Sequence, residues 1–103
     1  MTITDQTFDS ACRAHLDRYF AAYPDPKLEG RALHALRLLR ATDQPLTGIS
    51  AGWAAGIIYL AATDGRITCG VPSVLNRDFE QITGVTMSTA RKRAARVREI
   101  ILF

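Results

Sequence analysis

The sequence predicts a single all-α domain built around one enclosed helix. Two observations carry this prediction. An uncharged apolar stretch spans residues 50–63, and the segments on either side of it show helical spacing with no competing strand pattern. A chain of 103 residues is long enough to bury one core and too short for two domains. We therefore expect residues 1–103 to form one domain of five helices.

The stretch from Ser50 to Thr63 is the centre of the predicted fold. Its apolar residues fall on every side of a helical wheel, and a helix that is hydrophobic all round must be enclosed. A membrane-spanning helix needs about 20 apolar residues, so the enclosure has to come from the protein itself. Trp53 supplies the bulkiest side chain, and Gly56 lets a neighbouring helix come close.

Four further helices follow from apolar residues that recur every three or four positions. Asp25 and Pro26 form an N-cap followed by proline at the first helical position. Ser73 is the expected cap of a short fourth helix, which Gly84 ends. With their caps included, these helices are expected over about 7–22, 25–41 and 73–83, and from about Thr86 or Met87 to residue 102.

The net charge of +3 is unevenly placed along the chain. Residues 1–70 hold equal numbers of basic and acidic side chains, whereas residues 71–103 hold six basic against three acidic ones. All of the excess positive charge therefore lies in the last third of the chain. An anionic partner is expected to bind there.

The last two helices and the turn between them are a candidate helix-turn-helix over about 73–102. Such a unit needs a turn glycine, a small buried residue midway along the second helix, and basic side chains on its exposed face. Gly84 and Ala90 meet the first two needs. A solvated charged face is the alternative, but the excess charge coincides with the turn, which favours nucleic acid. The candidate DNA-binding cations are Arg91, Lys92, Arg93, Arg96 and Arg98.

Metal binding and catalysis are not expected. Cys12 and His15 lie one turn apart, and His34 and Cys69 could complete a set of four zinc ligands. However, the first two lie on the apolar face of their helix and the others are isolated in sequence. The sequence has no glycine-rich phosphate loop with lysine, no nucleophile motif and no acid–base pair. We therefore predict no metal, no cofactor and no enzymatic activity.

The compartment predicted from the sequence is the cytoplasm, with no membrane association. Residues 1–5 lack the basic and apolar regions of a signal peptide. Two cysteines do not make a disulfide framework and suit a reducing compartment.

Two segments resemble a known family. Residues 48–62, Gly-Ile-Ser-Ala-Gly-Trp-Ala-Ala-Gly-Ile-Ile-Tyr-Leu-Ala-Ala, are similar to the third helix of the cyclin-like repeats in transcription factor IIB and its archaeal counterpart, transcription factor B. Residues 82–93, Ile-Thr-Gly-Val-Thr-Met-Ser-Thr-Ala-Arg-Lys-Arg, resemble the turn and recognition helix of the second repeat. Glu80, however, stands where helix-turn-helix units usually have a small residue packed between the helices.

The resemblance implies a five-helix cyclin-like domain, or cyclin box, whose C-terminal helix-turn-helix enters the major groove of duplex DNA. It implies that Ser88 and Arg91 face bases. Nearer to phosphates it places Lys92, Arg93 and Arg96.

The first functional hypothesis is a small DNA-binding protein that regulates transcription through its basic last helix. The alternative is a protein-interaction adaptor with a cyclin-like fold and no DNA binding, because a fold does not determine a function. The sequence leaves open the DNA target, the direction of regulation, and whether a protein partner or a homodimer takes part.

Overall fold

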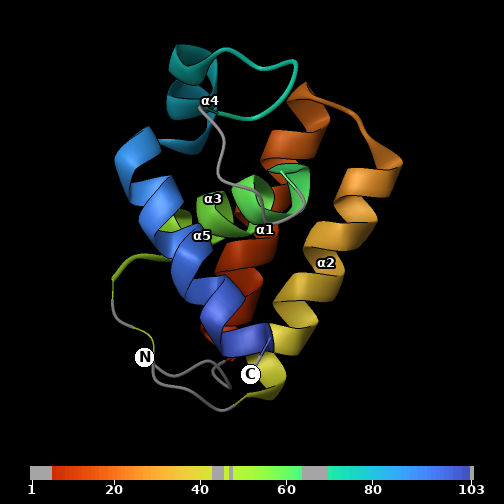
Figure 1. The fold of residues 1–103 in the computed structure, drawn as a ribbon. Helices are drawn as coiled ribbons and strands as arrows, with labels where there is room; N and C mark the ends of the chain where they lie inside the picture. Colours follow the sequence, from red (N-terminus) through yellow and green to blue (C-terminus); the bar gives the residue numbers. More distant parts are fainter. Residues whose placement is uncertain (1–5, 43–45, 47, 64–69, 103) are drawn as a thin grey trace.

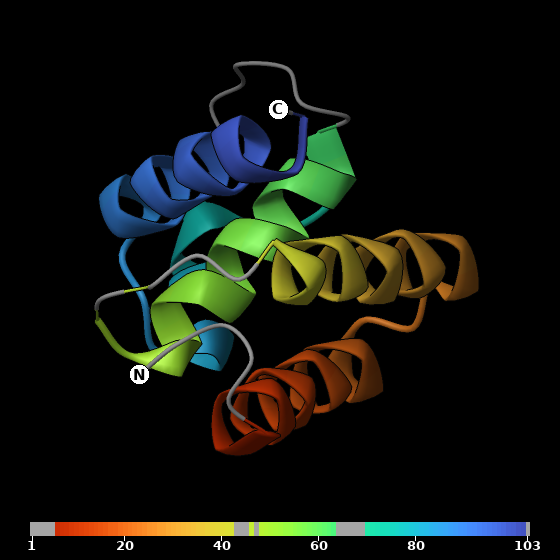
Figure 2. The same cartoon turned by 90° about the horizontal axis from the view of Figure 1, so that it is seen from below.

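A computed structural model describes residues 6–42, 46, 48–63 and 70–102, and this part of the chain is all-helical, as predicted. Figure 1 shows α3 crossing the middle of the domain, with α1, α2 and α5 around it and α4 at one end. Seen from below in Figure 2, α3 separates α5 from α1, and α2 lies beside it. The helices are α1 Gln6–Ala22, α2 Pro26–Ala41, α3 Ser50–Thr63, α4 Asn76–Thr83 and α5 Met87–Leu102.

The central position predicted for residues 50–63 is confirmed. Every residue of α3 from Gly52 to Tyr59 is buried, and the helix packs against α1, α2 and α5. Trp53 is 2% exposed and is among the largest fully buried side chains. Residues 60–62, in the last turn, are only half-buried. The uniform hydrophobicity of α3 thus corresponds to enclosure along most of its length.

Two predicted helix ends are also confirmed. The Asp25 carboxylate accepts a hydrogen bond from the backbone N–H of Leu28, 3.2 Å away, and Pro26 is the first residue of α2. Gly84 ends α4 in the left-handed conformation, with φ of 70°, where a residue without Cβ is unstrained. Its N–H donates to the carbonyl oxygen of Glu80 at 2.8 Å.

The predicted start of the fourth helix at Ser73 is wrong. Ser73 has φ of 69°, whereas an N-cap residue needs an extended backbone, so this serine cannot begin a helix. Leu75 holds the N-cap position instead and makes no side-chain cap hydrogen bond. Because α4 begins at Asn76, the candidate helix-turn-helix covers 76–102, and residues 70–75 form a non-helical segment in front of it.

Candidate nucleic-acid interface

The turn between α4 and α5 has three residues, Gly84, Val85 and Thr86. The N–H of Val85 donates to the hydroxyl oxygen of Thr83 at 3.3 Å, and the Val85 side chain is buried. Thr86 caps α5, because its hydroxyl oxygen accepts a hydrogen bond from the N–H of Thr89 at 3.2 Å. The turn is therefore held by its own polar groups and by one apolar anchor, as a short helix-turn-helix connection requires.

Glu80 forms a second link between the two helices. Its carboxylate accepts a hydrogen bond from the backbone N–H of Met87, 2.7 Å away. This N–H belongs to the first turn of α5, where backbone donors lack intrahelical partners and the helix dipole favours negative charge. Glu80 thus has a structural role at a position where a small packing residue is usual. Its carboxylate accepts a backbone N–H at the start of α5 and so links α5 to α4. Helical spacing and local motifs do not predict this contact, because it joins two different helices.

A close crossing with α3 determines which face of α5 points outward. Ala90 and Val97 are fully buried against the core. A Cβ atom added to Gly56 would lie 2.6 Å from the Cβ of Arg93 and 2.9 Å from the backbone nitrogen of Ala94. Only glycine fits at position 56 without movement of a helix, which supports the close approach expected there.

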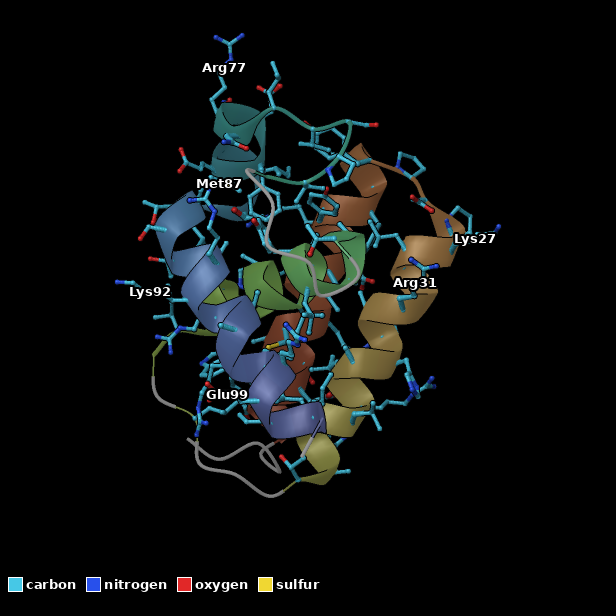
Figure 3. The ribbon with its side chains drawn as sticks, in the orientation of Figure 1. Lys27, Arg31, Arg77, Met87, Lys92 and Glu99 are labelled. Carbon is cyan, nitrogen blue, oxygen red and sulfur yellow. The ribbon has the colours of Figure 1, made fainter. Side chains whose placement is uncertain are left out.

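The outward face of α5 carries most of the predicted site residues. Ser88, Arg91 and Lys92 are exposed and, at positions i, i+3 and i+4, lie on one face of the first turns. Figure 3 shows Lys92 pointing away from the bundle. Among the described residues Lys92 has no ion-pair partner. Arg98 is also exposed and lies about two turns beyond Arg91.

Arg96 is exposed but is paired within its own helix. Its guanidinium Nη1 lies 3.1 Å from a carboxylate oxygen of Glu99, three residues later. The pair is open to solvent, so its contribution to stability is small. The pair also changes the surface charge of α5, because the Glu99 carboxylate offsets the positive charge of Arg96.

Arg93 lies apart from the other cations and is only half-buried by the fold. Its guanidinium carbon is 4.7 Å from the centre of the Trp53 ring, a distance typical of a cation–π contact. The Arg93 side chain also lies in contact with the position that a Cβ of Gly52 would occupy, and its guanidinium lies against Gly48. The structure therefore brings Arg93 onto α3 instead of placing it with the exposed cations.

The glycine spacing in the sequence is a signal from which this arrangement could be predicted. Gly48, Gly52 and Gly56 are spaced four residues apart. In the fold they leave a track without side chains along the start of α3, and Arg93 lies over it. Its helical position alone gave no reason to separate Arg93 from Arg91 and Lys92.

Three of the four candidate zinc ligands, Cys12, His15 and His34, lie within the described residues and belong to no cluster of metal ligands there. Burial, and secondarily the Asp9 carboxylate, raises the pKa of the Cys12 thiol to about 12, and the thiol donates to the carbonyl oxygen of Ser50 at 3.8 Å. His15 is near Arg18, and burial followed by this positive charge lowers the pKa of its imidazole. Cys69 lies outside the described residues, within which no three His, Cys, Asp or Glu side chains gather.

Comparison with protein-family models, with curated proteins and with solved structures gave no match. Among the helices that the structure describes, none has the length and apolar character needed to span a membrane.

Proposed function

We propose that the protein binds duplex DNA by inserting α5 into the major groove, and that it serves as a transcriptional regulator. The observation that carries the proposal is the three-residue turn, which joins α4 to a helix with a buried inner face and a basic outer face. An α-helix with its side chains is about 10–12 Å wide and the major groove about 12 Å, so α5 matches the groove in width. The other supports are the charge asymmetry of the chain and its resemblance to a promoter-reading repeat.

In this proposal the exposed residues of α5 divide into two roles. Ser88 and Arg91 lie in its first turns, from which recognition helices contact base edges. Lys92 and Arg98 contact phosphates, and Arg96 does so only in competition with Glu99. Arg93 is a positioning residue, because its guanidinium is held over Trp53.

The same proposal includes a specific fold within the all-α class, that of a cyclin-like repeat. Its support is the order of the five helices, with the uniformly apolar α3 at their centre and the helix-turn-helix at the end. A single module of this size makes few base contacts. Useful specificity then requires a second copy that reads another half-site about one helical turn away, or a partner already bound to DNA.

A salt titration on mixed-sequence duplex DNA tests this function. If Lys92, Arg96 and Arg98 each neutralise one phosphate, the logarithm of the DNA-binding constant falls with the logarithm of the salt concentration with a slope of about −3. Lys92→Ala should flatten the slope by about one, on every sequence alike. Arg37→Ala is the matched control, since it removes the same charge from an exposed position on α2 and should leave the slope unchanged.

Base reading is tested on a duplex selected from a random pool. Arg91→Ala should lose about 1–3 kcal/mol of binding free energy on that duplex and less on mixed sequence. Equal losses for Arg91→Ala and Lys92→Ala on both duplexes would mean that α5 is a non-specific electrostatic surface. No binding at micromolar protein and low salt would refute the function and leave the adaptor hypothesis.

A further inference from the structure

A hollow of about 540 Å³ lies at the end of the bundle near α4, away from the exposed face of α5. It is bounded by the last turn of α1, the first turns of α2, Ala62 of α3 and residues 71–74. Figure 1 shows these segments meeting at the upper end of the domain. Ligand-binding pockets usually enclose about 300–1,000 Å³, so the hollow has room for a small molecule.

The lining of the hollow combines an apolar wall with a positively charged rim. Its apolar and aromatic members come from four elements, which is the usual make-up of a ligand pocket with a few polar groups at defined places. Those polar groups are Asp25, Lys27, Arg31 and Ser73. The apolar members include Tyr19, Tyr23, Leu28, Val71 and Val74.

Charge indicates which ligands this hollow would accept. The Asp25 carboxylate is already engaged as the N-cap of α2 through the Leu28 N–H. In the described part of the chain neither Lys27 nor Arg31 has an ion-pair partner, and Figure 3 shows both on the first turns of α2. Two cations beside one engaged carboxylate favour a ligand with an apolar body and a negatively charged group.

Two parts of the lining of the hollow are connected to α4, one by a side-chain contact and the other through the chain itself. The Tyr19 ring, which lines it, makes an edge contact with Phe79 of α4, with ring centroids 5.9 Å apart. Residues 71–74 line it as well and run straight into the start of α4, with the left-handed Ser73 among them. Tyr23 borders both this hollow and a second one beside Asp78 and other residues of α4.

We propose that the hollow binds a small aromatic anion, such as an aromatic carboxylate, and that its occupancy changes the affinity of α5 for DNA through α4. The second half of this proposal rests on the proposed function, and the first half does not. A ligand that displaces Tyr19 or residues 71–74 would move α4, and Glu80 ties α4 to the first turn of α5.

Binding is tested without DNA by titrating 1-naphthoate into the isotopically labelled full chain and following backbone amide signals. Saturable shifts are expected at Tyr23, Leu28, Val71 and Val74, with the neutral analogue 1-naphthamide binding at least fivefold more weakly. Arg31→Ala should weaken naphthoate binding about tenfold and naphthamide binding less than twofold. Arg37→Ala, an exposed arginine of α2 outside the hollow, is the matched control and should change neither.

Three results would overturn the site. These are equal affinities for naphthoate and naphthamide, shifts centred on α5 instead of the hollow, and equal effects of Arg31→Ala and Arg37→Ala. Because both arginines are exposed, neither variant is expected to unfold the protein, and the unchanged remainder of the spectrum verifies this.

Regulation is tested by titrating duplex DNA with and without saturating naphthoate. The wild-type Kd for DNA should change at least threefold. That of Arg31→Ala should change less at the same naphthoate concentration, because the weaker site of this variant is filled to a smaller extent. Direct competition by naphthoate at α5 would change both equally and overturn the regulatory half, as would an unchanged wild-type Kd. Absence of DNA binding in every arm would overturn the proposed function together with regulation, whereas the amide shifts would still support the site.

Discussion

Replacing Gly56 with alanine tests the close crossing of α3 and α5 directly. The new Cβ would lie 2.6 Å from the Cβ of Arg93 and 2.9 Å from backbone atoms of α5, where ordinary contacts begin at 3.4 Å. Backbone cannot rotate aside as a side chain does. Helix α5 must therefore move away from α3 by roughly an ångström, or both helices must bend.

The expected magnitude is a balance of two terms. Overpacking at a tight contact typically destabilises by about 1–3 kcal/mol. Alanine is favoured over glycine inside a helix by about 1 kcal/mol, which offsets part of that loss. The free energy of unfolding of Gly56→Ala should fall by up to about 2 kcal/mol after the two terms are combined.

Gly30→Ala provides the matched control for this measurement. Gly30 also lies inside a helix, but among the described residues nothing beyond its chain neighbours and the backbone of its own helix lies within 4 Å of the position that its Cβ would occupy. Only the propensity term applies there, so Gly30→Ala should raise the free energy of unfolding by about 0.5–1 kcal/mol. Both variants are measured by urea unfolding. Equal stabilisation by the two substitutions would refute the close crossing and the outward orientation of α5 derived from it.

Three further predictions concern the core, the link between α4 and α5, and alkaline pH. Trp53→Ala should lower the free energy of unfolding by about 3–5 kcal/mol, and a loss below about 1 kcal/mol would contradict its burial. Glu80→Ala removes the acceptor of the Met87 N–H and should lose about 0.5–2 kcal/mol in the same assay, with Glu80→Gln closer to wild type because its amide oxygen can still accept. For Cys12, whose thiol pKa is raised to about 12 from 9.0, the unfolded chain loses this proton first, so stability is intact below pH 9 and falls as pH rises toward 12. Unfolding curves at pH 8 and pH 10 should show this loss, at most about 1.4 kcal/mol per pH unit, and a Cys12→Ala variant with the same pH dependence would contradict it.

Several features of the fold were predictable because they depend on neighbouring residues. Uniform hydrophobicity between Ser50 and Thr63 required enclosure whatever surrounded it. Asp25 followed by Pro26 started α2, and Gly84 stopped α4, through contacts within one turn of the chain. The exposure of Arg91 and Lys92 follows in the same way from helical spacing, once Ala90 and Ala94 are known to face inward.

Other features were decided only by the tertiary structure. Helical spacing gives the angle of Arg93 on α5, but its contact with Trp53 depends on glycines that lie far away in the chain. The hydrogen-bond partner of the Glu80 carboxylate is not in its own helix. It is the N–H of Met87, which only the fold of the turn brings close. Ser73 has the chemistry of a cap, yet the path of the chain holds it at positive φ. The spacing of apolar residues predicts which side of a helix is buried. The partner of each side chain depends instead on how separate helices cross, and no local interaction determines that crossing.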